Sequence, residues 1–506
     1  MNTSTIDVQH DPLLEWVRQG VIGRRAPLRT PFGVKVKRYF DQTASGQPFG
    51  PIEDLIRDRI LPYMANTHTE ASFTGRFMTC QFEAAHARIR ASLRAREDDV
   101  VLFVGSGCTG AINRLIATLG LRLPERLCAS VNVDELMPEA DRPLVVRSRM
   151  EHHSNDIPWR ETIAVTEYIG YDEQGRPDWH ELDRLLSRPE HRDRRLKIGT
   201  FSAASNVTGI LSDVDSLAEV MHAHQGYAFF DYAAAAPYVD IDLHPDPEDK
   251  RRKNAVFLSV HKFLGGPQTP GVLAGNRALF STRAPAEPGG GTVLYTSPWA
   301  WRYLDDLQAR EEGGTPPIVQ GIRAGLVFEL KERIGVPRLE AIERHFVRRA
   351  MEAWQGDGRI RILGNPDSPR IGIVSLILDH GHLHHNLAVR LLNDLYGVQV
   401  RGGCMCAGTY GHDLLGIDQS HSEQIRGRLD HGELAAKPGW VRVSFGPGTD
   451  EEDFQVVLKA VPDIAHNWRA YAEGYHMDPH TAEWHHRDDP SDVVPLHLDI
   501  PTLAAP

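Results

Sequence analysis

The sequence lacks three features that would place the protein in other classes. It has no uninterrupted apolar run of about 18 residues, which a transmembrane helix requires. Its first residues, MNTSTIDVQHDPLLEW, lack the basic and then apolar pattern of a secretory signal. Basic residues (56) are fewer than acidic ones (68), so the charge of −12 lacks the basic excess of nucleic-acid-binding proteins. We therefore expect a cytoplasmic protein that acts on small molecules, with neither nucleic acid nor membrane as a partner.

Cysteine is also scarce, with 5 residues in a chain of 506. This number is too small for a disulfide framework, and a reducing compartment would keep such residues as free thiols, either buried or reactive. The cysteines are Cys80, Cys108, Cys128, Cys404 and Cys406.

Short apolar runs alternate with amphipathic helical patterns between residues 50 and 280. The runs are at 100–104, 144–146, 196–202, 227–230 and 255–260. Strands that alternate with helices predict an α/β fold with a mainly parallel sheet covered on both faces.

The pattern changes after residue 316, where long helices precede a few strands. We predict an N-terminal segment at 1–48 that joins a small domain, a large domain at 49–315, that small C-terminal α/β domain at 316–472, and an irregular tail at 473–506. The tail contains four histidines, which either bind metal or, as we favour, face solvent. These are His476, His480, His485 and His486.

A lysine follows the last apolar run of the large domain, in residues 258–267 (LSVHKFLGGP). A buried amine at the end of a strand is costly unless it is neutral or bonded, and a desolvated lysine can act as a nucleophile. Lys262 is therefore a candidate catalytic residue, although on this motif alone it could be an ordinary surface lysine.

Two further motifs end strands at the same edge of the predicted sheet. Asp231 comes directly after the run at 227–230, where α/β proteins bind ligands. The segment 104–113 (VGSGCTGAIN) combines a glycine-rich turn with a helix start, an arrangement that binds phosphate through backbone N–H groups and a hydroxyl. Each motif alone also fits a plain turn. The glycine spacing of 105–110 fits a nicotinamide site too, but no acidic residue ends a second strand about 20 residues later.

Two polar segments complete the set of candidates. Residues 151–159 (EHHSNDIPW) carry a histidine pair that can stack on an aromatic cofactor or relay protons. One His-His dipeptide has no metal-ligand spacing, so we predict no metal there. Residues 205–209 (SNVTG) follow another strand, and Asn206 can bond a ring oxygen or simply form a turn.

Together and in this order, these motifs resemble the class V aminotransferase family, and most closely its cysteine desulfurase and selenocysteine lyase branch. The similarity extends from Tyr39 to about Leu458, which is most of the chain. The resemblance implies a pyridoxal-phosphate (PLP) enzyme of fold type I.

The resemblance also implies a role for each candidate. Lys262 would be the Schiff-base lysine, Asp231 the partner of the pyridine nitrogen, Asn206 that of the ring oxygen, and His152 the residue that stacks on the ring and passes protons. The phosphate would be bound by Gly107, Cys108, Thr109, Ser259 and His261.

Two more positions match residues that contact substrate or a neighbouring subunit. Arg442 matches the arginine that binds the substrate carboxylate, a task suited to its two-pronged guanidinium. Thr315 lies in a segment (GGTP) that in the family reaches the phosphate of the neighbouring subunit. The resemblance thus implies a homodimer with shared active sites.

The segment 400–407 (VRGGCMCA) resembles the family's cysteine loop, with Cys406 at the position of the nucleophile and Cys404 as an extra thiol. The expected reaction is desulfuration of L-cysteine to L-alanine, with a persulfide left on Cys406 for a sulfur-acceptor protein. Ala234 replaces the branch's usual glutamine, and the stretch from Cys406 to Arg442 is longer than in the family. Both departures favour the alternative of an aminotransferase, lyase or epimerase that acts on another amino acid without a persulfide step.

Overall fold

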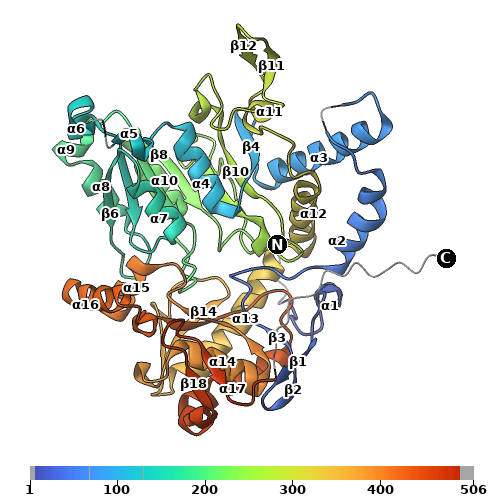
Figure 1. The fold of residues 1–506 in the computed structure, drawn as a ribbon, viewed down its shortest axis with the longest axis vertical. Coiled ribbons are helices and arrows are strands. Elements are labelled where there is room, and N and C mark those ends of the chain that lie inside the picture. Colours follow the sequence, from blue (N-terminus) through green and yellow to red (C-terminus); the bar gives the residue numbers. More distant parts are fainter. Residues whose placement is uncertain (1–5, 68, 129, 131, 491–506) are drawn as a thin grey trace.

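The computed structural model describes residues 6–67, 69–128, 130 and 132–490, and it shows two α/β units stacked on each other (Figure 1). Among these residues, no helix has both the length and the apolar character needed to cross a membrane.

The larger unit is built on a seven-stranded sheet with the order β4-β10-β9-β8-β7-β5-β6. Only β10 runs antiparallel to its neighbours; the remaining pairs are parallel. The α/β prediction with a mainly parallel sheet is therefore confirmed. The strands are β4 (Asp99–Val104), β5 (Leu144–Ser148), β6 (Val165–Ile169), β7 (Lys197–Ser202), β8 (Tyr227–Asp231), β9 (Ala255–Ser259) and β10 (Gly271–Asn276).

Alternating side chains of these strands pack against helices on both faces of the sheet. Val101 and Phe103 of β4 join one core with α3, α8, α10 and α12, while Val100 and Leu102 join another with α4 and Trp159 of α7. This division follows from the two-residue period of a strand. The helices of the unit are α2 (Gly50–Leu55), α3 (Phe73–Ser92), α4 (Gly107–Thr118), α5 (Glu125–Cys128), α6 (Val133–Leu136), α7 (His153–Arg160), α8 (Trp179–Leu186), α9 (Pro189–Arg192), α10 (Val214–Ala223), α11 (Leu307–Glu311) and α12 (Ile318–Ile334).

The smaller unit has a four-stranded antiparallel sheet with the order β13-β14-β17-β16. Helices α13 and α14 pack against this sheet, and α17 packs against both of these helices. Its strands are β13 (Ile360–Ile362), β14 (Ile373–Leu378), β16 (Arg401–Gly403) and β17 (Trp440–Ser444). Its helices are α13 (Val336–Gln355), α14 (His385–Tyr396), α15 (Gly408–Leu415), α16 (Gln419–Asp430) and α17 (Glu451–Tyr471).

The N-terminal segment lies against the smaller unit. After α1 (Pro12–Gly20), the hairpin of β1 (Pro27–Thr30) and β2 (Gly33–Val36) contacts α14. The next strand, β3 (Arg38–Tyr39), pairs in parallel with β15 (Val398–Gln399). Asp41 follows β3 and so reaches the edge of the small sheet, where it bridges to Ser444.

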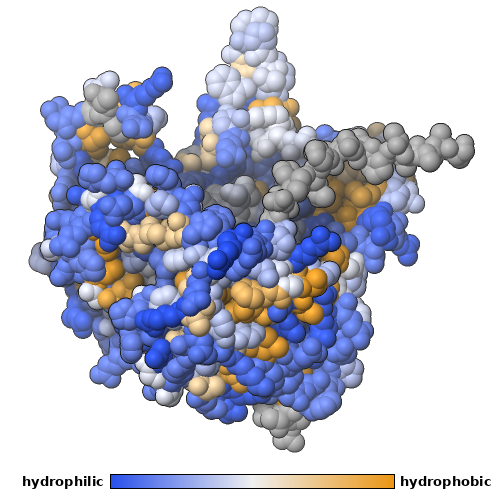
Figure 2. All heavy atoms as spheres, turned by 60° about the horizontal axis from the view of Figure 1, so that its bottom comes forward, coloured by the Kyte–Doolittle hydropathy of each residue, from blue (hydrophilic) through white to orange (hydrophobic). Residues whose placement is uncertain are grey.

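Two more short hairpins lie outside the two main sheets. The strands β11 (Val293–Thr296) and β12 (Trp301–Tyr303) form one that projects from the larger unit (Figure 1). Near the C-terminus, β18 (Tyr475–Met477) pairs with β19 (Trp484–His486), so this part of the predicted irregular tail is ordered into strands. Seen from the side of the smaller unit, hydrophilic residues cover most of the surface, with apolar patches between them (Figure 2).

Candidate active site

The candidate lysine lies just beyond the carboxyl end of β9, in a short 3₁₀ turn of residues Val260–Lys262. The ammonium group of Lys262 makes no hydrogen bond or ion pair with any described residue. Burial lowers the pKa of Lys262, while the nearby Cys108 and Asp231 act in the opposite direction. A buried amine without a partner is unusual in a folded protein and fits a group that forms a covalent bond.

The candidate aspartate ends the adjacent strand β8 and is 4% exposed. One oxygen of Asp231 accepts the backbone N–H of Ala233 at 2.8 Å. Burial raises the pKa of Asp231, and the charge of Lys262 opposes that rise. Asp231, Lys262 and Cys108 each affect the pKa values of the other two, so the three side chains lie near one another.

The N-terminus of α4 faces the same place and depends on a glycine. Gly107 has φ +57°, and a Cβ there would lie 2.7 Å from the hydroxyl oxygen of Ser259 and 2.9 Å from the ring of His261. The Ser259 hydroxyl accepts the backbone N–H of Cys108 at 2.9 Å. Thr109 is exposed, and its hydroxyl lies 2.7 Å from that of Ser154 at the start of α7. Residues 107–109, Ser259 and His261 thus gather N–H and O–H donors at a helix N-terminus, which is suited to binding phosphate.

His152 caps the N-terminus of α7, where its Nδ1 accepts the backbone N–H of Ser154 at 3.1 Å. Burial, assisted by the charge of Lys262, lowers the pKa of His152 to about 3. The ring is therefore neutral at neutral pH. Its interaction with Lys262 places it at the same site.

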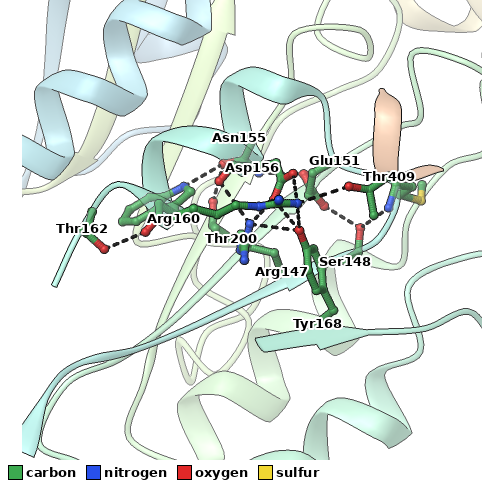
Figure 3. A network of polar contacts seen from close by, with 12 residues as sticks. Arg147, Ser148, Glu151, Asn155, Asp156, Arg160, Thr162, Tyr168, Thr200 and Thr409 are labelled. Carbon is green, nitrogen blue, oxygen red and sulfur yellow. Dashed lines mark hydrogen bonds and ion pairs between the residues drawn. The ribbon is translucent and has the colours of Figure 1, made fainter. Parts of the chain in front are cut away.

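A buried polar network involves residues on both sides of His152 in the sequence, among them Glu151 and Asn155 (Figure 3). The carboxylate of Glu151 is 2% exposed and accepts hydrogen bonds from Ser148, Asn155 and Ser202. Burial raises the pKa of Glu151 to about 7. The conspicuous EHHSNDIPW pattern thus consists largely of residues that position His152 rather than of reacting groups.

The same network reaches the cysteine-containing segment. Arg147 and Asp156 form a buried ion pair, and Asp156 also accepts a hydrogen bond from Arg160 at 2.6 Å. The guanidinium of Arg160 donates to the hydroxyl of Thr409 at 3.3 Å (Figure 3). Thr409 lies in α15, directly after the cysteine segment, so the network connects the two units.

Cys404 to Ala407 form a tight turn whose ends are joined by a 3.1 Å hydrogen bond from the Ala407 N–H to the Cys404 carbonyl. Its two central residues, Met405 and Cys406, have φ +53° and +54°. Left-handed backbone is costly for residues other than glycine and requires support from its surroundings. Cys406 is exposed on this turn, whereas Cys404 is half-buried.

The support comes from two residues of the larger unit. The side-chain amide of Asn206 donates to the Met405 carbonyl at 2.7 Å. His153 binds the turn twice: its backbone N–H donates to the Cys406 carbonyl at 2.7 Å, and its Nε2 accepts the Gly408 N–H at 2.9 Å. This contact to the cysteine turn was not predicted for His153, and its place beside His152 in the motif was the only available signal.

Arg442 is 3% exposed in β17 and is held by two partners. It donates to the Asn206 carbonyl at 2.9 Å and to the Asp41 carboxylate at 3.1 Å. Asp41 also pairs with Arg401 at 3.1 Å. Burial lowers the pKa of Arg442, and Asp41 opposes this. Asp41 was not among the candidates, because only the fold brings it beside residues about 400 positions away.

Thr315 is not part of this cluster within one chain. It is exposed, its hydroxyl accepts from Asn66 at 3.4 Å, and it lines a cleft of about 700 Å³ with Gly105, Ser106 and Gly110. The cleft therefore adjoins the glycine-rich turn before α4.

One group of metal-type ligands occurs among the described residues, and it lies at the opposite end of β4. Asp98, Asp99 and His244 form it. The two ring nitrogens of His244 already contact Asp99 and Asp249, each at 2.7 Å. These contacts explain the cluster as a hydrogen-bonded group within the protein.

The chain belongs to the class V aminotransferase family, whose model matches residues 38–457. Its similarity to proteins named as cysteine desulfurases confirms the branch that the motifs indicated. A probable cysteine desulfurase of Halalkalibacterium halodurans is 28% identical over 377 residues, which are 73% of this chain and 84% of that protein. A cysteine desulfurase of Haloferax volcanii is 28% identical over 76% of this chain and 83% of that protein.

Solved structures share the fold. A cysteine desulfurase of Thermococcus onnurineus has a TM-score of 0.70 at 22% identity and covers 89% of this chain and 98% of its own. The cysteine desulfurase CsdA of Escherichia coli has a TM-score of 0.68 at 20% identity, with coverage of 90% and 98%. At these identities the likeness establishes the fold.

Proposed function

We propose that this protein is a PLP-dependent cysteine desulfurase, which converts L-cysteine to L-alanine and keeps the sulfur as a persulfide on Cys406. The observation that carries the proposal is the cysteine turn: an exposed thiol in left-handed backbone is fixed by Asn206 and His153, beside the Lys262 cluster. The similarity to proteins named as cysteine desulfurases supports the same reaction.

The residues present fit the cofactor. The Lys262 amine has no other partner among the residues that the structure describes, and Asp231 is a buried carboxylate of the kind that keeps a pyridine nitrogen protonated. Gly107, Cys108, Thr109, Ser259 and His261 would hold the phosphate. Asn206 would bond the ring oxygen with the amide hydrogen that it does not donate to Met405. When bound, PLP supplies an aldehyde for the substrate amine and a ring that takes up electrons.

Two groups, Lys262 and His152, are suited to moving the protons of the reaction. Because burial lowers the pKa of Lys262, its Nζ can be neutral and take the proton from the substrate α-carbon. His152 is neutral because of its pKa of about 3, so it can stack on the ring and pass protons without adding charge.

The sulfur step needs no oxidant or reductant other than the substrate and the Cys406 thiolate. The thiolate Sγ of Cys406 attacks the substrate sulfur, an S–S bond forms, and the substrate C–S bond breaks. The three-carbon product gains a proton and leaves as alanine. Arg442 would hold the substrate carboxylate, and Asp41 would orient the guanidinium from its other side.

We also propose a homodimer with shared sites and a sulfur-acceptor protein. Thr315 is exposed next to the projecting β11–β12 hairpin, whose Trp299 and Trp301 are 89% and 54% exposed. Large exposed aromatic residues commonly mark a protein interface. A second subunit there would cover the hairpin and bring Thr315 to the neighbouring phosphate site.

The test is an assay of the PLP-loaded protein with L-cysteine and a dithiol, measuring alanine and sulfide. The wild type should form both in equal amounts, and Cys406→Ala should lose roughly 100-fold or more of the sulfide, since it lacks the nucleophile. Cys80→Ser, at an exposed cysteine of α3, is the matched control and should act like the wild type. If Cys406→Ala releases sulfide as fast as the wild type, the persulfide step is wrong.

The alternative is a class V aminotransferase, lyase or epimerase that acts on another amino acid, and Ala234 favours it. Alanine supplies no side-chain amide at this buried position (5% exposed), where the desulfurase branch usually has glutamine. Such an enzyme needs Lys262 but not Cys406. Unchanged turnover of some other amino acid by Cys406→Ala, with no alanine from cysteine in the wild type, would establish it.

A further inference from the structure

The cysteine turn carries two thiols, and the proposed reaction uses one of them. Cys404 and Cys406 flank Met405 in a turn closed by the Ala407 N–H. Consecutive Cα atoms are about 3.8 Å apart, and the turn folds the chain back, so the two Cα atoms lie within the roughly 4.4–6.8 Å that a disulfide spans.

The turn is also fixed on both sides of the pair. Asn206 binds the Met405 carbonyl at 2.7 Å, and His153 binds the Cys406 carbonyl at 2.7 Å. A fixed backbone holds the two Cα positions close together, so rotation about the side-chain bonds is all that is needed for one thiol to meet the other at high effective concentration.

Two further cysteines, Cys108 and Cys80, lie outside the turn. Cys108 is buried beside Asp231, and Cys80 is in α3 of the larger unit. Cys404 is half-buried and packs at the edge of the cluster that contains Met405 and Trp440, while Cys406 is exposed. The half-buried Cys404 is therefore two residues from the exposed Cys406, which receives the sulfur in the proposed reaction.

We propose that Cys404 is the resolving thiol of the site, which releases the bound sulfur as hydrosulfide. This inference rests on the proposed function, because the persulfide on Cys406 is its substrate. The Cys404 thiolate attacks Cys406 Sγ, a Cys404–Cys406 disulfide forms, the bond to the outer sulfur breaks, and the electron pair leaves with that sulfur as HS⁻. Reduction of the disulfide by a dithiol returns both thiols and is required for the next turnover.

The acidity of the leaving group favours release of hydrosulfide over transfer of the outer sulfur to Cys404. Thiol–disulfide exchange expels the more acidic leaving group faster, and hydrosulfide is more acidic than an alkyl thiol. The enzyme would then deliver free sulfide whenever a dithiol is present, in addition to any delivery to an acceptor protein.

The test is a single turnover of the PLP-loaded protein with L-cysteine and no reductant, followed by acid quenching and alkylation. Trypsin releases both thiols, and no other cysteine, in one peptide of residues 402–426. In the wild type we expect this peptide to be two hydrogens lighter than the reduced form and unalkylated, with sulfide released in the amount of alanine formed. Cys404→Ser should instead retain a persulfide on Cys406 and release sulfide at least about tenfold more slowly, because only bimolecular attack remains.

Matched variants separate the outcomes. Cys404→Ser should still form alanine in the first turnover, because it keeps the Cys406 thiol that attacks the substrate, and Cys80→Ser should behave like the wild type throughout. If the wild-type peptide keeps the persulfide as long as Cys404→Ser does, the resolving role is refuted and the desulfurase assignment stands. If the wild type forms no alanine, the proposed function fails and the resolving role fails with it. Diamide treatment of the same protein then shows whether the two thiols can pair at all.

Discussion

At the scale of single residues, Lys262 has the simplest expectation. Its amine is buried without a partner beside Asp231 and Cys108. We expect the purified protein with PLP to show a yellow chromophore that borohydride fixes to the chain, and Lys262→Ala to lose it. The measurement is the visible spectrum before and after reduction and dialysis. An equally stable, reducible chromophore in Lys262→Ala would remove the basis of the proposed function.

The adjacent residues His152 and His153 should have different roles in the reaction. His152 is next to Lys262, whereas His153 holds the cysteine turn by its Nε2. We expect His153→Ala to leave the chromophore unchanged and to lower the rate of sulfide formation by roughly tenfold. Such a change corresponds to an increase of about 1.4 kcal/mol in the activation free energy. His152→Ala should alter both the spectrum and the rate. Identical effects of the two substitutions would contradict this division.

Residues with local signals were predictable. Lys262, Asp231 and Gly107 stand at strand ends or a helix start, and such positions can be recognised from periodicity and turn chemistry. His153 and Asp41 were not predictable. They act through the cysteine turn and Arg442, more than 250 and 400 positions away, and only the packing of the two units makes these contacts.

At the scale of elements, the start of α4 depends on Gly107. Its φ of +57° and the 2.7 Å approach to Ser259 leave no room for a methyl group. We expect Gly107→Ala to destabilise the protein by about 1–3 kcal/mol and to weaken phosphate binding more than tenfold, because left-handed alanine is strained and Ser259 must move. Urea unfolding and PLP titration check the two effects. Gly120→Ala is a control, since its φ is +67° but no atom lies within 4 Å of its Cβ position. Gly120→Ala should lower the stability of the protein without changing its affinity for PLP.

Helix α13 carries a buried carboxyl group whose ionisation should be visible in stability. Glu343 is 5% exposed and accepts the Gly372 N–H at 2.9 Å. Burial raises its pKa from 4.5 to about 8. The native state therefore binds this proton more tightly than the unfolded state does, and its contribution to stability falls as pH rises from 4.5 to about 8.

Glu343→Gln keeps an oxygen for Gly372 but cannot ionise. We expect this variant to match the wild type near pH 5 and to exceed it in stability by a few kcal/mol at pH 9. Urea unfolding at both pH values measures the difference. A difference that does not change with pH would show that Glu343 is not the titrating group.

At the scale of the whole molecule, the sequence predicted the class of fold and its parallel sheet well. Strands with continuous apolar runs are typical of a sheet covered on both faces, as observed in β4 and β9. The β18–β19 hairpin and the α15–α16 insertion were not predicted. Their residues are largely polar and lack periodic apolar patterns, so local sequence gives little information.

The proposed dimer gives the whole-molecule prediction. Trp299→Ser with Trp301→Ser should remove the apolar hairpin surface and shift the protein to monomers in sedimentation velocity. Thr315→Ala should remain dimeric but bind PLP more weakly, because the hydroxyl is lost from the neighbouring phosphate site. A wild-type protein that sediments as a monomer at micromolar concentration would refute the shared site.

The pairing of β3 with β15 has a consequence for biosynthesis. Residues 38–39 find their partners at 398–399, so the N-terminal segment emerges from the ribosome long before the strand that completes its ladder. The large sheet can form during translation, since all its strands precede residue 277. Asp41 can bind the guanidinium of Arg442 only after about 400 further residues have been made.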